Sequence, residues 1–361
     1  MKHFLSCLFT STILLAASMS ANAQTVFYDA SAFPLIGKIT AETETRFERL
    51  PSDLKNNVPR AALWSLGKNT SGLAILFNSN SSSISAKWEV LSNVRMNHFT
   101  DTGIKGLDLY SWKDNKWQFV RSALPTGKIS EEVIISNMTT KEREYMLFLP
   151  LYDGVTSLSI GIDSLATITP PLIHNIDYAN PIVVYGTSIT QGGCATRPGM
   201  SYTNILTRWM SREFINLGFS GNGQLDYEIA EVLAKRTDAG MFVLDFVPNV
   251  DETKIKERTQ HFVSIIRKKN PHAPILFMES IIFPHSVFDT YTAKNLVDKN
   301  AALFAEFEAL KNSGDNNIYY LNSDNLISMD GEGTVDGVHL TDLGFQHIAL
   351  TLMNKIKTII N

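Results

Sequence analysis

A serine flanked by glycines follows a short apolar run in the second half of the chain. Gly186-Thr-Ser188 comes directly after Ile182-Val-Val-Tyr, and Gly192 and Gly193 follow. Glycines let the backbone turn sharply and let a ligand approach it closely, so this hydroxyl is a candidate nucleophile. The segment is not a G-x-S-x-G elbow, because Thr190 replaces the second glycine. It also lacks the lysine of a phosphate-binding loop, which favours a nucleophile over a phosphate cradle.

An aspartate and a histidine lie three residues apart near the C-terminal end of the chain, in Asp336-Gly-Val-His339. A serine hydroxyl needs a base within hydrogen-bond reach before it can attack at neutral pH. An imidazole can take the proton, and a carboxylate can hold the imidazole in the required tautomer. The alternative is an Asp-Gly turn followed by a helix-capping histidine. We predict that Ser188, His339 and Asp336 form a catalytic triad.

Two further segments contain groups that can stabilise an oxyanion. Gly221 lies in Phe-Ser-Gly-Asn, and Asn249 ends Val-Pro-Asn. Ester hydrolysis passes through a negatively charged oxygen, which needs hydrogen-bond donors aimed at it. Each segment alone fits an ordinary turn, but both follow predicted strands in a consistent order with the serine. We predict an oxyanion hole made of the amides of Ser188 and Gly221 and the Asn249 side chain.

These candidates all follow strands in an alternating pattern that begins near residue 181. We expect strands at 182–185, from 215, and at 241–245, 275–278 and 318–321, with helices at 202–214, 228–236, 251–269 and 341–360 and a further helix face between 296 and 310. Such alternation predicts a parallel sheet with helices on both faces. Ligands of these sheets bind beyond the carboxyl ends of the strands, where the candidate residues fall.

The first half of the chain has the character of a β-sandwich, with short alternating strands separated by turn residues between about 25 and 175. Trp88, Trp112 and Trp117 are candidates for a sugar-stacking face, although packing inside the sandwich is the interpretation that we favour. The junction around Thr167-Ile-Thr-Pro-Pro is short and contains two prolines. It predicts a stiff connection, so the sandwich should pack against the second half.

The candidate residues, in this order, resemble the SGNH (GDSL-type) hydrolase superfamily, which is named for Ser, Gly, Asn and His in four blocks. Ser188, Gly221, Asn249 and the pair Asp336 and His339 match those blocks, and the resemblance runs from about residue 182 to the end. It implies a flavodoxin-like three-layer αβα hydrolase domain. The preceding segment resembles the N-terminal, jelly-roll-like β-sandwich of some secreted bacterial members. The family also implies ester hydrolysis through an acyl-serine, with no metal and no other cofactor.

The match to this family has departures in two blocks. Thr187 stands where the family has the aspartate of Gly-Asp-Ser, which is not one of the four namesake residues. Val247 and Val250 replace the glycine and the aspartate of the usual G-x-N-D block. These two replacements leave the pose of Asn249 open.

The composition and the N-terminus indicate an exported globular protein. Hydrophobic residues make up 44% and charged residues 19%, as in a folded globular protein. The formal net charge of −4 comes without a basic stripe, so we expect no nucleic-acid partner. A basic start, an apolar run at 4–17 and Ala21-Asn-Ala23 predict a signal peptide, 1–23, cleaved after Ala23. That run is shorter than the roughly 20 residues that a membrane span needs. The predicted domains are a sandwich at 24–175 and a hydrolase domain at 176–361, in the periplasm or outside the cell.

The cysteines and the remaining histidines predict no further chemistry. Cleavage removes Cys7 and leaves Cys194 without an intramolecular partner, so we expect a buried, inert thiol, not a second nucleophile. The other histidines have no metal-ligand spacing, and no metal site is predicted. His285 follows the fourth predicted strand and fits either a pocket wall or a plain loop.

These features predict an esterase that removes short acyl groups, acetyl above all, from a small molecule or a carbohydrate. The carbohydrate rests on export and on the appended sandwich, a fold-level analogy. One alternative is a lipid esterase of the platelet-activating-factor acetylhydrolase-like type. Another is a glycan-binding protein with an idle hydrolase domain. The sequence does not indicate the oligomeric state.

Overall fold

The computed structural model describes residues 24–173, 175–328 and 330–360. The predicted signal peptide, residues 1–23, lies outside the described residues. Among the residues that are described, no helix is both long and apolar enough to cross a membrane.

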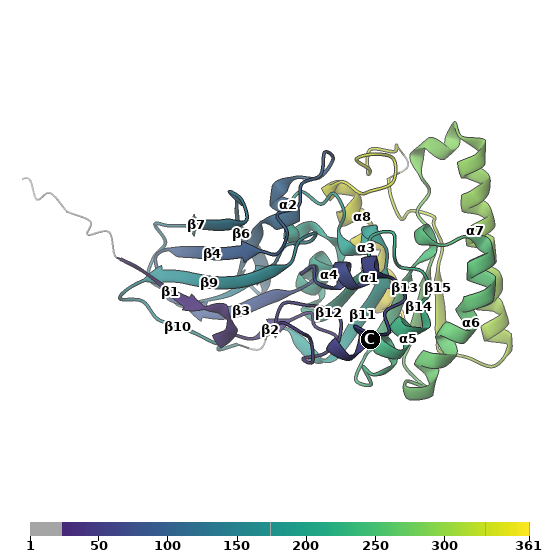
Figure 1. Ribbon diagram of the computed structural model, residues 1–361, viewed down its shortest axis with the longest axis horizontal. Coiled ribbons are helices and arrows are strands. Elements are labelled where there is room, and N and C mark those ends of the chain that lie inside the picture. Colours follow the sequence, from purple (N-terminus) through teal and green to yellow (C-terminus); the bar gives the residue numbers. More distant parts are fainter. Residues whose placement is uncertain (1–23, 174, 329, 361) are drawn as a thin grey trace, which may run out of the picture.

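Two antiparallel sheets pack face to face in the first part of the chain, as predicted (Figure 1). The first has the strand order β1 (Thr25–Asp29), β9 (Val155–Asp163), β4 (Ile84–Val90) and β7 (Ile129–Ile135). The second has the order β10 (Ile168–Thr169), β3 (Ala74–Ser79), β8 (Arg143–Phe148), β5 (Leu107–Lys113) and β6 (Lys116–Ala123), with β2 (Leu35–Ile36) paired to β3. Alternate residues of both sheets point inward and form one hydrophobic core.

The tryptophans of the sandwich pack inside it or against one another, as we favoured from the sequence. Trp88 is buried in the core between the sheets, and its indole N–H donates to the Lys105 carbonyl at 2.9 Å. Trp117 is buried against Trp112, with ring centroids 5.3 Å apart. Trp88 therefore cannot contribute to a sugar-stacking face.

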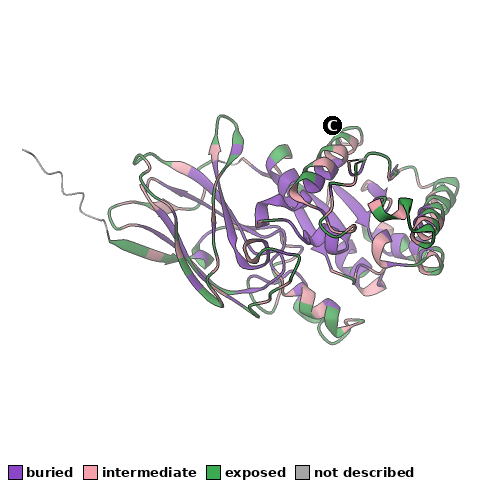
Figure 2. Ribbon diagram, turned by 90° about the horizontal axis from the view of Figure 1, so that it is seen from above, coloured by how far each residue is buried: buried purple, intermediate pink, exposed green. Residues whose placement is uncertain are grey.

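A five-stranded parallel sheet forms the centre of the second part. Its strand order is β12 (Arg212–Gly218), β11 (Asp177–Gly186), β13 (Met241–Asp245), β14 (Ile275–Met278) and β15 (Ile318–Leu321). Chain order along the sheet is thus 2-1-3-4-5, which is the flavodoxin-like order. Alternate side chains point to opposite faces, and both sets are buried because helices cover both faces (Figure 2).

Helices of the second part pack on both faces of the parallel sheet. One hydrophobic cluster joins the sheet to α5 (Tyr227–Ala234), α6 (Glu252–Lys269) and α7 (Thr290–Asn312). The other joins it to α3 (Ser188–Gln191), α4 (Tyr202–Met210) and α8 (Asp342–Lys357). The predicted three-layer αβα fold is confirmed.

One predicted helix was wrong at its C-terminal end, where it included the start of a strand. The sequence predicted a helix over 202–214, whereas α4 ends at Met210 and strand β12 begins at Arg212. Ser211 ends the helix in a left-handed conformation, with φ of 48°. Glu213 and Phe214 then belong to strand β12, where successive side chains point to opposite faces of the sheet. Phe214 is buried in the hydrophobic cluster on the α4 side, and the Glu213 carboxylate accepts from the Gly37 amide.

Residues from the first part of the chain belong to both hydrophobic clusters of the second part. The predicted packing of the two parts against each other is therefore confirmed. Ile39, Leu50, Leu54 and Leu63 complete the cluster on the α5 side, with Leu63 coming from α1 (Ala61–Gly67). Phe99, Ile104, Leu151 and Tyr152 belong to the cluster on the α4 side, with Ile104 coming from α2 (Asp101–Lys105). The boundary between residues 175 and 176 remains our prediction.

Candidate active site

Ser188 is the first residue of the short helix α3, and only Thr187 separates it from the carboxyl end of β11. Thr187 caps this helix, since its hydroxyl accepts from the Ile189 amide at 3.3 Å. In return, the hydroxyl of Thr190 accepts from the Thr187 amide at 3.2 Å. Threonine at the family's aspartate position therefore serves as a helix cap. As the first helical residue, Ser188 has an amide that no carbonyl of the helix accepts.

The structure brings the three residues of the predicted triad together. The Nε2 atom of His339 lies 3.0 Å from the Ser188 hydroxyl. Its Nδ1 atom lies 2.7 Å from Asp336 Oδ2, and the other carboxylate oxygen accepts from the backbone amides of Val338 and His339. Gly337, with φ of +89°, makes the turn that lets Asp336 face His339. The predicted base, orienting carboxylate and nucleophile thus form one hydrogen-bonded chain.

The carboxyl group of Asp336 is held in its ionised form. Partial burial opposes ionisation, but hydrogen bonds from the His339 ring and from the backbone amides of His339 and Val338 lower the pKa of Asp336 to about 2. A carboxylate that stays charged can keep the Nδ1 proton of the imidazole in place. Nε2 is then free to accept a proton from Ser188.

A buried aspartate that the sequence did not single out holds the helix that carries Ser188. Asp245, at the end of β13, accepts from the hydroxyls of Thr190 at 2.7 Å and Tyr202 at 2.9 Å. Burial raises the pKa of Asp245 to about 7, against the opposing effect of these two hydrogen bonds. A Cβ on Gly186 would lie 2.0 Å from the Thr190 hydroxyl oxygen, so only glycine fits where β11 meets α3.

The two segments predicted to supply oxyanion donors contact each other beyond the carboxyl ends of β12 and β13. Asn249 ends a short 3-10 turn after β13, and its side-chain oxygen accepts from the Gly223 amide at 3.2 Å. Its NH2 group is therefore the part of the carboxamide that remains available as a donor. Gly221 adopts a left-handed φ of +67° in the loop after β12. Val247 and Val250, which depart from the family pattern, are buried in the core beneath this turn.

Arg49, from the first part of the chain, fixes the strand end that leads into the Gly221 loop. Its guanidinium is fully buried and donates to the carbonyls of Asn216 at 3.1 Å and Gly218 at 2.9 Å. The same group lies 4.9 Å from the ring centre of Phe219. Nothing in the local sequence signals this role, because Arg49 and its partners are far apart in the chain.

Three further side chains lie near the predicted triad, and the sequence had singled out two of them, Cys194 and His285. Cys194 is buried, and burial together with the nearby Asp336 carboxylate raises the pKa of its thiol to about 12, so it is a poor nucleophile. His98, on the loop between β4 and α2, has its ring centroid 5.8 Å from that of His339. A Cβ on Gly337 would lie 2.8 Å from His285 Nδ1, so His285 lies against the Asp336 loop.

The sequence matches two family models. Residues 179–357 match the GDSL-like lipase/acylhydrolase family, and residues 25–168 match the N-terminus of SGNH hydrolase-type esterases. Among curated proteins, none matches the sequence.

Solved structures with the same architecture include one of high sequence identity. A Bacteroides ovatus protein described as a GDSL-like lipase is 39% identical, with a TM-score of 0.89 over 93% of this chain and 98% of its own. A salicylyl-acyltransferase, SsfX3, from a tetracycline biosynthetic pathway is 16% identical, with a TM-score of 0.73 over 93% and 97%. A family two carbohydrate esterase from Cellvibrio japonicus is 14% identical, with a TM-score of 0.58 over 93% and 98%. The latter two share the fold.

Proposed function

This chain belongs to the GDSL-like lipase/acylhydrolase family and is a carboxylic ester hydrolase, and on that premise we propose that it removes short acyl groups, acetyl above all, from carbohydrate esters through an acyl intermediate on Ser188. The observation that supports this proposal most strongly is the hydrogen-bonded chain from Asp336 through His339 to Ser188. An idle hydrolase domain would not need to keep these three side chains aligned.

In the proposed reaction, His339 Nε2 takes the Ser188 proton while the serine oxygen attacks the ester carbonyl carbon. Asp336 keeps the other ring nitrogen protonated and stabilises the imidazolium that forms. The amides of Ser188 and Gly221 and the Asn249 side chain donate to the oxyanion. His339 then gives its proton to the leaving alcohol oxygen. Water, activated by the same imidazole, attacks the acyl-serine and releases the acid.

Two considerations favour a short acyl group on a carbohydrate. Family two carbohydrate esterases share this two-part architecture, although at 14% identity the likeness concerns the fold. The proposed export, with cleavage after Ala23, would place the enzyme where polysaccharides are met. A mature N-terminus at Gln24, read by mass spectrometry of the exported protein, tests that step.

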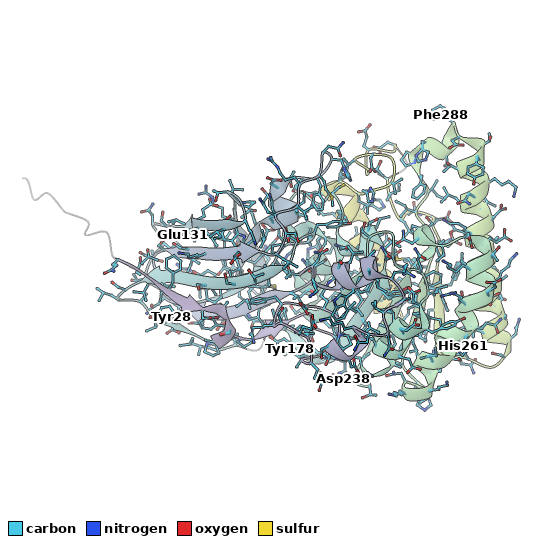
Figure 3. The ribbon with its side chains drawn as sticks, viewed as in Figure 1. Tyr28, Glu131, Tyr178, Asp238, His261 and Phe288 are labelled. Carbon is cyan, nitrogen blue, oxygen red and sulfur yellow. The ribbon has the colours of Figure 1, made fainter. Side chains whose placement is uncertain are left out.

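A lipid esterase is the second candidate, and one surface feature favours it. Val287, Phe288 and Tyr291 are 79%, 89% and 79% exposed, at and beyond the 3-10 turn η5 (Pro284–Val287) that contains His285. Figure 3 shows Phe288 at the upper end of α7, directed away from the molecule. These three exposed apolar residues lie next to or a few residues beyond His285, which lies against the Asp336 loop. Exposed apolar surface of this kind can mark a site that docks on lipid.

A chain-length series of p-nitrophenyl esters, run beside acetylated glycans and a short-chain acetyl phospholipid, separates the two candidates. We expect kcat/KM to be highest for acetate and acetate to be released from an acetylated glycan. We also expect Phe288→Ala to leave acetyl ester turnover unchanged. Faster turnover of octanoate than of acetate, together with a selective loss of octanoate hydrolysis in Phe288→Ala, would establish the lipid esterase instead.

A further inference from the structure

Three side chains that are good ligands for soft divalent cations meet at the rim of the proposed active site. His98 comes from the loop between β4 and α2, Cys194 from the loop after α3, and His339 from the loop before α8. One ligand atom from each residue lies within 4.8 Å of the ligand atoms of the other two. We propose that these three residues bind a zinc-like divalent cation, and that the bound cation inhibits ester hydrolysis by occupying His339.

The donor set and its spacing suit zinc. Zn²⁺ prefers thiolate sulfur and imidazole nitrogen, and sites with three protein ligands leave a fourth position for water. At bond lengths of about 2.0–2.3 Å, neighbouring ligand atoms of a tetrahedral site are about 3.4–3.6 Å apart. The observed spacing, within 4.8 Å, needs only a small closing movement. His98 is exposed on its loop, so its side chain can rotate to supply that movement.

Both imidazoles carry the outer hydrogen bond that is typical of metal-bound histidine. His339 Nδ1 pairs with the Asp336 carboxylate at 2.7 Å, and His98 Nδ1 pairs with the Asn97 side-chain oxygen at 2.9 Å. A ligating histidine usually donates its second ring N–H to an oxygen in this way, which fixes the tautomer and raises the basicity of the other nitrogen. The Nε2 atoms of both rings are thereby left as the ligands.

The backbone holds Cys194 in place between the two histidines. Its φ of 74° is left-handed, a conformation that is costly for a residue with a side chain and persists only where the surroundings enforce it. The side chain is 5% exposed, so the sulfur is directed into the protein next to the triad. A thiol that coordinates a divalent cation gives up its proton to do so, even where burial otherwise keeps it protonated.

The bound cation would inhibit hydrolysis because His339 is both one of its ligands and the proposed base. The nitrogen of His339 that would bind the cation is the one that lies 3.0 Å from the Ser188 hydroxyl. A lone pair bound to a cation cannot accept the serine proton, so the nucleophile loses its base. This inference goes beyond the proposed function, because the three ligands do not include Ser188. Cation binding can therefore be measured in a Ser188→Ala protein, separately from ester hydrolysis.

Cobalt spectroscopy on the untagged, chelator-treated chain tests the proposal directly. Co²⁺ occupies such sites, and coordination by a thiolate adds a near-ultraviolet charge-transfer band to the visible bands of tetrahedral cobalt. We expect these bands in the wild-type protein and in Ser188→Ala, and we expect Zn²⁺ to abolish them. Cys194→Ser should lose the charge-transfer band. His272→Ala is the matched control, since His272 precedes β14 at the edge of the sheet opposite the active site.

The second test measures how Zn²⁺ inhibits ester hydrolysis, with each variant compared with its own metal-free rate. We expect Zn²⁺ to inhibit the wild-type protein reversibly, and the inhibition constant to rise at least about tenfold in His98→Ala and in Cys194→Ser. His272→Ala should match the wild type. Equal inhibition of all four proteins, or cobalt binding without a thiolate band, would overturn the proposal.

Discussion

The proposed nucleophile of this protein is a hydroxyl whose hydrogen-bond partners are in place before any substrate arrives. Ser188 lies within hydrogen-bond distance of His339 Nε2, and Asp336 is fixed by both a ring nitrogen and backbone amides. The side-chain oxygen of Asn249 accepts from the Gly223 amide, so its NH2 group remains available as a hydrogen-bond donor. Donors that are already in place need no reorganisation when charge develops on the substrate oxygen.

Asn249 tests this reasoning for the oxyanion hole. We expect Asn249→Ala to lower kcat about 10²–10³-fold with little change in KM, because the donor acts on the transition state and not on the bound ester. Steady-state kinetics on p-nitrophenyl acetate measure both constants, and a thermal melt checks that the fold survives. A rise in KM at constant kcat would mean that Asn249 binds the ground-state ester instead.

Three strands of the second part place these side chains, because their carboxyl ends lie side by side at one end of the sheet. Strands β11, β12 and β13 are neighbours, and they end at Gly186, Gly218 and Asp245. Asp245 then ties helix α3 to helix α4 through Thr190 and Tyr202. Asp245 is thus a positioning residue, because it fixes helix α3, whose first residue is Ser188.

Asp245 gives the stability of the protein a distinct pH dependence. Folding raises the pKa of this carboxyl from 3.8 to about 7, so the folded state binds its proton more tightly than the unfolded state. The free energy of unfolding should therefore fall as pH rises through that interval. We expect Asp245→Asn to flatten the slope in urea unfolding, with Asp114→Asn, in an exposed turn, as the control. The same slope in Asp245→Asn and the wild type would contradict this assignment.

The strands and the site residues of the parallel sheet were predictable because their signals are local. Met241–Asp245, Ile275–Met278 and Ile318–Leu321 are short apolar runs, and they form strands at those same positions. The helix that was predicted to run through Phe214 failed because a left-handed Ser211 ends it. Asp245 was missed for a related reason, since an aspartate at a strand end looks like any other until its distant partners are known.

At the scale of the whole molecule, residues from the first part of the chain help to hold the proposed active site in place. Tyr152 donates to the Ser188 carbonyl at 3.2 Å, and the Ser71 hydroxyl donates to the Gln191 carbonyl at 2.6 Å. Arg49 holds the end of β12 from the other side. These contacts join residues more than a hundred positions apart in some cases, so no local pattern could reveal them.

This shared construction predicts that the second part does not fold well by itself. A fragment from Asn175 to Asn361 would expose the apolar surface that Leu50, Leu54 and Leu63 cover, and we expect it to be insoluble or inactive. Expression beside the chain from Gln24, followed by size-exclusion chromatography and p-nitrophenyl acetate hydrolysis, measures the difference. A soluble fragment that hydrolyses both this ester and an acetylated glycan as fast as the full chain would show that the sandwich is dispensable.

The central claim is that Ser188 is the nucleophile, and covalent labelling tests it most directly. A fluorophosphonate probe reacts with a serine that has an active base beside it, and mass spectrometry of the digested protein locates the modified residue. We predict a single label on Ser188, with hydrolysis lost in proportion, no label in Ser188→Ala, and a fall in kcat of about 10⁴ or more in that variant. Complete inactivation with the label on another residue, or a Ser188→Ala protein that keeps more than about a hundredth of the wild-type rate, would contradict it.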